Sequence, residues 1–323
     1  LSHNRYTQFN VDAKGLVLNN TNTSQMQYQS QLAGQIMANY NMANPAKVIL
    51  NEVVSASRSQ LAGYTEVLGG RADVILANPY GITCNGCGFI NTDRVTLSTG
   101  VPSIKADGSL AGFAVSQGDI LINGTGLNGS AQQVLDLVTR SVKIDGQLNA
   151  QDLGIYTGAN NWDYASRSVP GPAGASGPAP TYAIDSSSLG GMYANRIRLV
   201  STDAGVGVRM LGDAAANGDD FTLTSAGRIE INSRVSAQRD LRMATTQSGA
   251  GALSLDGGSL SAKGKLGLDA SAGGMQLRGG TLVAGGDMEV VASSLLDAAA
   301  AADGAAGQKT RSAGGDPSPR RAP

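Results

Sequence analysis

The residues of this chain best suited to chemistry are a pair of cysteines, in Cys84-Asn85-Gly86-Cys87. A structural zinc ion needs four ligands. The chain offers only these two cysteines and one distant histidine, His3, so we expect no metal site. A thioredoxin-type redox pair begins a helix after a strand, whereas this pair lies between two strand-like runs. The pair therefore favours a disulfide that locks a turn in an oxidising compartment, with two buried free thiols as the alternative.

Acid–base and nucleotide chemistry have little support in the sequence. The one histidine lies near the start, and no Gly-x-Ser-x-Gly, phosphate-binding loop or His-Glu-x-x-His pattern occurs. The run from Gly124 to Gly129 has the spacing of a nucleotide-binding fingerprint. It follows a strand-like segment but leads into no long amphipathic helix, so it predicts a turn. We expect no cofactor.

Composition excludes several classes of partner. The chain has 323 residues, with 44 glycines, four phenylalanines and one tryptophan, and only 15% of its residues are charged. Its net charge is −1, so no polybasic surface is available for nucleic acid or anionic lipid. The apolar run from Leu295 to Ala302 is far shorter than the roughly 18 residues of a membrane span. If the protein is exported, we expect that its signal peptide has already been removed.

Three segments in the last third of the chain repeat without gaps over eleven residues, beginning at Ser233, Gly258 and Gly280. Their apolar positions coincide, and a further apolar position repeats upstream of each segment. The coinciding sets are Val235, Leu260 and Leu282; Ala237, Ala262 and Ala284; Leu241, Leu266 and Met288; and, upstream, Ile231, Leu255 and Leu277. The repeat is 22 to 25 residues long.

Within each repeat, apolar residues alternate with polar or small ones, which indicates half-buried strands. Frequent glycine suits the corners between strands. Stacked repeats would pair each strand with its counterpart one coil on, about 4.8 Å away. We therefore predict an all-β fold, a right-handed parallel β-helix with small extra-helical β elements and a disordered C-terminal tail. Two segments are less regular: Ala131–Leu137 predicts a helical turn or a coil with a polar corner, and Pro170–Pro180 predicts a loop or inserted linker.

A parallel β-helix is also the fold of many polysaccharide lyases and hydrolases. Such an enzyme would place clustered carboxylates on one outer face. By density alone, the candidates are Asp203, Asp213, Asp219 and Asp220. Acidic residues in turns are more often solvated corners, so a β-helical carbohydrate-active enzyme stands as the alternative function.

The segment from Asn78 to Thr92 resembles the signature of the two-partner secretion domain, which belongs to filamentous haemagglutinin-like and contact-dependent-inhibition exoproteins. Its residues are Asn-Pro-Tyr-Gly-Ile-Thr-Cys-Asn-Gly-Cys-Gly-Phe-Ile-Asn-Thr. Further strings follow in the family's order within residues 1–212. They are Ser2–Asn4, Phe9–Val11, Gly15–Asn20, Ile49–Val53, Ser59–Leu61, Gly112–Val115, Gly190–Val200 and Gly205–Val208.

Two departures from the family's pattern affect its turns. The Asn-Pro-Asn-Gly-Ile motif reads Asn78-Pro79-Tyr80-Gly81-Ile82, and the upstream Asn-Pro-Asn-Leu element is reduced to Asn39-Tyr40-Asn41-Met42. Proline and glycine still suit a tight turn at the first motif. Tyr80 cannot supply a local Asx hydrogen bond, so we expect this turn to be looser.

The resemblance implies an N-terminal secretion domain at residues 1–225. The start of haemagglutinin-type repeats follows at 226–300, and a disordered tail at 301–323. The chain would be the N-terminal part of a large adhesin or of the stalk of a contact-dependent toxin, and we expect that the chain itself is not an enzyme. It would be secreted or displayed at the cell surface, having crossed the periplasm and outer membrane of a Gram-negative bacterium.

The resemblance also implies a partner. An outer-membrane β-barrel transporter of the TpsB type would recognise the largely unfolded chain through its periplasmic POTRA domains. Receptors on host or neighbouring cells are further partners that it implies. The recognition residues would be Asn78, Pro79, Gly81, Ile82, Asn39 and Asn41, with the Cys84–Cys87 disulfide as a clasp on the turn.

Overall fold

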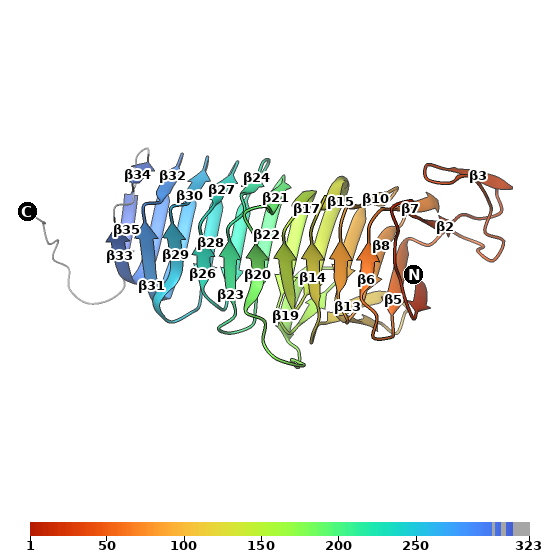
Figure 1. Ribbon diagram of the computed structural model, residues 1–323, viewed down its shortest axis with the longest axis horizontal. Helices are drawn as coiled ribbons and strands as arrows, with labels where there is room; N and C mark the ends of the chain where they lie inside the picture. Colours follow the sequence, from red (N-terminus) through yellow and green to blue (C-terminus); the bar gives the residue numbers. More distant parts are fainter. Residues whose placement is uncertain (299–300, 305–307, 313–323) are drawn as a thin grey trace, which may run out of the picture.

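The computed structural model describes residues 1–298, 301–304 and 308–312. Within these residues every regular element is a β-strand, and the strands stack into one elongated rod (Figure 1). The pairings between successive coils are parallel, so the predicted parallel β-helix is confirmed. A right-handed turn is the sense expected where crossovers join parallel strands of one sheet.

Each coil contributes one strand to each of three faces. Face 1 consists of β1 (Ser2–Tyr6), β5 (Val48–Val53), β8 (Asp73–Ala77), β11 (Arg94–Ser98), the ends of β15 (Leu127–Thr139) and β17 (Gln147–Thr157), β22 (Arg196–Ser201), β25 (Phe221–Ser225), β28 (Leu241–Thr245), the starts of β31 (Leu266–Arg278) and β33 (Met288–Ala298), and β35 (Gln308–Ser312).

Face 2 follows face 1 in the chain. It consists of β6 (Ser59–Leu61), β9 (Ile82–Cys84), β14 (Asp119–Ile122), β16 (Ser141–Ile144), β20 (Tyr182–Ser186), β23 (Gly207–Met210), β26 (Ile229–Ile231), β29 (Gly249–Asp256) and the ends of β31 and β33. Face 3 completes each coil. It consists of β2 (Leu16–Asn20), β7 (Tyr64–Gly69), β10 (Cys87–Ile90), the starts of β15 and β17, β21 (Gly191–Ala194), β24 (Ala214–Ala216), β27 (Arg234–Ala237), β30 (Ser259–Ala262), β32 (Thr281–Ala284) and β34 (Ala301–Gly304).

The coils stack in the register that the repeat predicts. Residues at the coinciding apolar positions are Cα partners on neighbouring strands, and all of them are buried. The ladders are Val235–Leu260–Leu282, Ala237–Ala262–Ala284, Leu241–Leu266–Met288 and Ile231–Leu255–Leu277. Period-two alternation therefore directs one set of side chains into the rod, where removal of apolar surface from water stabilises each added coil.

Two antiparallel sheets lie outside the coils, as predicted for extra-helical β elements. One is the hairpin of β3 (Gln27–Ser30) and β4 (Gly34–Met37); the other has four strands, β12 (Val101–Ile104), β13 (Leu110–Ala114), β18 (Asn160–Asp163) and β19 (Ser168–Pro172). The four-stranded sheet packs on the outer side of face 1 through a second apolar core. This core contains Leu50, Ile75, Ala77, Leu110, Phe113, Val115, Val138, Tyr156 and the single tryptophan, Trp162.

Two local segments differ from expectation. Ala131–Leu137 lies inside β15, so the helical-turn interpretation is wrong; the pairing register shifts between Gly129 and Val134, as at a bulge. Pro170–Pro180 is only partly a loop, because Ser168–Pro172 forms β19. Proline is tolerated there because β19 is the edge strand of its sheet, and an N–H that points away from the sheet is not needed for strand pairing.

The last described strands continue the rod. β34 pairs with β32 and β35 pairs with β33. These two strands are the described parts of the tail predicted at 301–323, and the rest of that tail lies outside the described residues. At the predicted boundary between 225 and 226, β25 passes to β26 with no break in the ladders. Among the described residues, no helix is long and apolar enough to cross a membrane.

Candidate functional site

The predicted recognition turn is a closed turn between β8 and β9. The Gly81 N–H donates to the Asn78 carbonyl oxygen (3.0 Å), and the Tyr80 N–H donates to Asn78 Oδ1 (3.0 Å). Gly81 has φ of +104°, in a region that favours glycine. The expectation of a looser turn is wrong, because Asn78 itself supplies the Asx hydrogen bond.

Asn78 joins three successive coils. Its Nδ2 donates to the Ser57 carbonyl (2.8 Å) and to Ser59 Oγ (2.9 Å) in the preceding coil. Its backbone N–H donates to the Ser98 carbonyl (2.8 Å) in the following coil. Asn78 and Ile82 are both 0% exposed, so the folded rod presents neither side chain to solvent.

Arg58 and Asp119 clamp this turn, and neither belongs to a motif that the sequence singles out. Arg58 Nη1 and Nη2 donate to the two carboxylate oxygens of Asp119 (2.8 Å each), and Arg58 Nε donates to Thr83 Oγ1 (2.7 Å). A Cβ at Gly81 would lie 3.0 Å from Arg58 Cζ, so glycine also leaves room for the guanidinium. Arg58 and Asp119 are 61 positions apart, and no local pattern signals their pairing.

The two cysteines form a disulfide at the corner between β9 and β10. The Cα atoms of Cys84 and Cys87 are 5.4 Å apart, and both residues are buried. Gly86 in the enclosed turn has φ of +82° and donates its N–H to the Gly126 carbonyl (2.8 Å) of the next coil. Of the two alternatives from the sequence, the disulfide is the one present.

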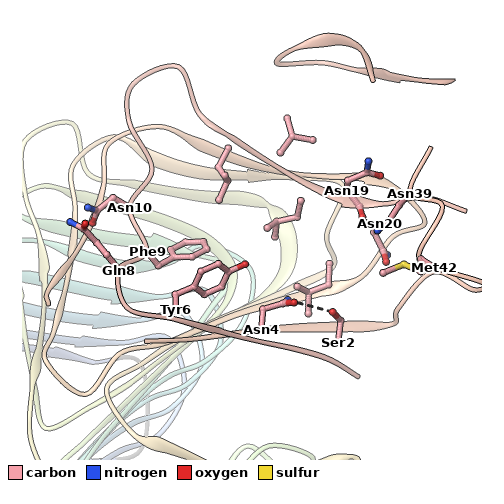
Figure 2. Close-up of a pocket in the computed structure, with 14 residues that line it drawn as sticks. Ser2, Asn4, Tyr6, Gln8, Phe9, Asn10, Asn19, Asn20, Asn39 and Met42 are labelled. Carbon is pink, nitrogen blue, oxygen red and sulfur yellow. Dashed lines mark hydrogen bonds between the residues drawn. The ribbon is translucent and has the colours of Figure 1, made fainter. Parts of the chain in front are cut away.

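Asn39 and Asn41 lie in a different place, at the end of the rod where the chain begins. Asn39 Nδ2 donates to the Asn19 carbonyl (3.3 Å), and Asn39 Oδ1 accepts from the Asn41 N–H (3.1 Å). Figure 2 shows Asn39 beside Asn19 and Asn20, across a groove of about 430 Å³ from Asn4. Among the described residues, no hydrogen bond joins this group to the turn at Asn78. The six predicted recognition residues therefore form two separate groups.

The four carboxylates considered for a β-helical enzyme are not gathered at one place. They lie at three corners of the rod, and each is already bound by other residues. Asp203 binds Arg140 Nε (2.5 Å), Asp213 binds Arg234 Nη2 (2.6 Å), Asp219 binds Arg239 Nη1 (3.0 Å) and Asp220 accepts the Asp240 N–H (3.0 Å). These carboxylates stabilise corners, and their geometry does not form an acid–base pair.

A buried ion network fastens the four-stranded sheet to face 1. Asp136 is 0% exposed and accepts hydrogen bonds from Arg167 Nη2 (2.9 Å) and Arg94 Nη2 (3.2 Å). Arg167 lies between β18 and β19 and also binds Asp152 (3.0 Å). Burial raises the pKa of Asp136, and the two guanidinium groups oppose that rise. Removing either partner would leave a buried carboxylate under-compensated.

A hydrogen bond at the same interface joins Tyr164 to face 1. The Tyr164 hydroxyl donates to Asp73 Oδ2 (2.7 Å), and the Arg94 guanidinium stacks 3.9 Å from the Tyr164 ring centre. Burial raises the pKa of Asp73, while the bond from Tyr164 and the charge of Arg94 act in the opposite direction.

Comparison with known proteins identifies the family to which this chain is similar. Residues 1–231 match the sequence model of a family described as the TPS secretion domain. The chain is 49% identical over 239 residues to the 16S rRNA endonuclease CdiA of Enterobacter cloacae, covering 73% of this chain and 7% of that protein. It is 49% identical over 236 residues to the tRNA nuclease CdiA of Yersinia mollaretii, covering 73% and 8%. The chain thus spans less than a tenth of these relatives.

Two solved structures resemble the rod. The filamentous hemagglutinin secretion domain matches with a TM-score of 0.62 and 36% identity, covering 84% of this chain and 88% of that one. The HMW1 secretion domain from Haemophilus influenzae matches with a TM-score of 0.54, covering 95% and 92%. At 18% identity, the second likeness shows the fold alone.

The family match covers more than half of the chain and includes the turn at Asn78, the disulfide and the four-stranded sheet. The matched domain is a secretion domain and not a catalytic one. This chain therefore belongs to the family of TPS secretion domains, the domains of CdiA-type and filamentous haemagglutinin-type proteins that are secreted through the outer membrane of Gram-negative bacteria.

Proposed function

We propose that this chain directs the export of a large contact-dependent-inhibition exoprotein through a partner outer-membrane β-barrel transporter. The partner's periplasmic POTRA domains bind the unfolded chain at the segment from Asn78 to Ile82. The chain then folds at the cell surface and starts the rod on which the rest of the exoprotein stacks. In this proposal residues 1–225 are the secretion domain and residues 226–300 begin the repeats. The chain itself catalyses nothing.

The burial of Asn78 is the observation that carries the proposed recognition. In the folded rod, Asn78 and Ile82 are both 0% exposed. A transporter that binds the side chains of Asn78 and Ile82 must therefore bind them before the neighbouring coils have folded. Each added coil then gains buried apolar surface, so folding outside the cell favours outward movement of the chain. No ATP is needed for this step.

The proposal of a contact-dependent-inhibition protein depends on the curated relatives, which are named as CdiA toxins and nucleases. A filamentous adhesin is the second candidate, since the filamentous hemagglutinin secretion domain is 36% identical. In either case, receptors on host or neighbouring cells would be bound by parts of the exoprotein beyond this domain.

Binding of the unfolded chain to the partner's periplasmic domains tests the proposed recognition. We expect urea-unfolded chain, diluted into buffer, to bind these domains, and the double variant Asn78→Ala/Pro79→Ala to bind at least tenfold more weakly. Asn160→Ala is the matched control. Asn160 is also 0% exposed, and its Nδ2 also donates to one carbonyl and one hydroxyl (Thr157 and Thr202). Equal loss of binding in both variants would contradict recognition at Asn78.

A further inference from the structure

A second groove lies on the outer side of face 3. Its volume is about 550 Å³, and all its lining residues are uncharged. They are Tyr64, Gly86, Cys87, Thr125, Gly126, Asn128, Ser130 and Asn149. One wall of the groove is the corner closed by the disulfide, where a Cβ at Gly86 would lie 2.5 Å from Thr125 Oγ1. The disulfide thus closes the corner that forms this wall.

The ring of Tyr64 forms an aromatic platform at this groove. A Cβ at Gly88 would lie 2.7 Å from Tyr64 Cζ and 2.8 Å from Cδ1, so the ring covers Gly88 and only glycine leaves room for it. Tyr64 is 37% exposed. Its hydroxyl oxygen accepts a hydrogen bond from Asn128 Nδ2 (3.1 Å), which leaves the hydroxyl proton available to a ligand.

Two amides lie in a row next to this platform. Asn128 and Asn149 are Cα partners on β15 and β17, so they are spaced by one coil, about 4.8 Å. That spacing is comparable to the length of one sugar ring. Asn128 Oδ1 accepts from the Ser130 hydroxyl (2.7 Å). Among the described residues, no hydrogen bond engages the side chain of Asn149, so its donors and acceptor are open to a ligand.

We propose that this groove binds a neutral oligosaccharide. An aromatic ring face packs against the C–H face of a pyranose ring, while fixed amide and hydroxyl groups bond its hydroxyl or acetamido groups. The uncharged lining offers no counter-charge to an anionic glycan or a phosphate. It also offers no carboxylate, so the bound sugar is held and not cleaved. The site is independent of transporter recognition, because it needs the folded coils.

Titration of the folded chain with small sugars tests this site. The probes are chitotriose and cellotriose, with trigalacturonate as the charged comparison, measured by calorimetry or by ligand-observed NMR. We expect saturable binding of at least one neutral trisaccharide, with unchanged sugar at the end of the titration. Tyr64→Ala is expected to weaken binding about tenfold or more, since the platform is lost. Tyr64→Phe, which keeps the ring, is expected to lose less.

Tyr80→Ala is the control, because Tyr80 is another exposed tyrosine (45%) and does not line the groove. If Tyr64→Ala lowers the melting temperature, Asn149→Ala provides the second variant and is expected to weaken binding several-fold. Three results would each overturn the proposal. They are no saturable binding of either neutral sugar, equal binding by all variants, and tighter binding of trigalacturonate than of the neutral probes.

Discussion

At the residue scale, the turn from Asn78 to Ile82 depends on groups from distant parts of the chain. The sequence predicts a turn here because proline and glycine occupy suitable positions. It could not predict that Asn78 would be buried, because its partners Ser57 and Ser98 lie in the coils before and after it. The pairing of Arg58 with Asp119 could not be predicted from the sequence either, because only the stacking of coils brings these two residues together.

Replacement of Gly81 tests how tightly this turn is held. Gly81→Ala introduces a Cβ at φ of +104° and against the Arg58 guanidinium. We expect it to lower the free energy of unfolding by about 2–3 kcal/mol. Gly174→Ala is the control, because nothing lies within 4 Å of its Cβ position and its φ is not positive. Urea unfolding followed by circular dichroism measures both, and similar stabilities for the two variants would contradict a constrained turn.

Asp73 makes stability depend on pH in a predictable direction. Burial raises its pKa in the folded state, so its contribution is favourable below its unfolded pKa and is lost as pH rises through the folded pKa. Asp73→Asn removes the buried charge and keeps an oxygen that accepts from the Tyr164 hydroxyl. We expect the melting temperature of the variant, relative to wild type, to be higher at pH 7 than at pH 3.5. A difference in the opposite direction would show that pairing outweighs burial at Asp73.

At the scale of elements, the repeats predict the coils, whereas the extra-helical β elements were predicted without their positions or their pairing. The repeated apolar positions predict the ladders, because each coil repeats one local pattern and stacks on the last. Strands β12 and β13 interrupt one coil, and β18 and β19 interrupt another. Their antiparallel pairing across some 50 residues, as of Phe113 with Trp162, leaves no periodic signal.

The ion network at Asp136 is expected to hold this sheet in place. Arg167→Met keeps much of the side chain's apolar length but leaves Asp136, 0% exposed, with one guanidinium partner. We expect a loss of about 3–5 kcal/mol at pH 7. The loss should shrink toward pH 4, because the pKa of the under-compensated Asp136 rises further in the folded state.

Arg239→Met is the control for the network. Its side chain is 66% exposed and pairs with Asp219 at a corner, so we expect a change within about 1 kcal/mol. Urea unfolding followed by Trp162 fluorescence reports directly on the second core. Equal stability of the two variants would mean that apolar packing alone holds the sheet.

At the scale of the whole molecule, the rod is one continuous stack, and its residues 1–231 match the TPS secretion domain. The sequence predicted both the fold and the family. The repeated apolar positions indicate the fold, and contiguous motifs such as Asn78–Thr92 indicate the family. It placed Asn39 and Asn41 with Asn78 as one recognition set, whereas the rod separates them. The local sequence shows which residues belong to one motif. Which motifs lie next to each other depends on how the coils stack.

Export from living cells tests the central claim most directly. The chain, given a periplasmic signal peptide, is produced in a Gram-negative host with or without its partner transporter, and folded protein in the medium is quantified by protease resistance. We predict export only with the transporter, its loss in Asn78→Ala/Pro79→Ala, and its retention in Asn160→Ala. Export without the transporter, or equal export of all three chains, would contradict the account.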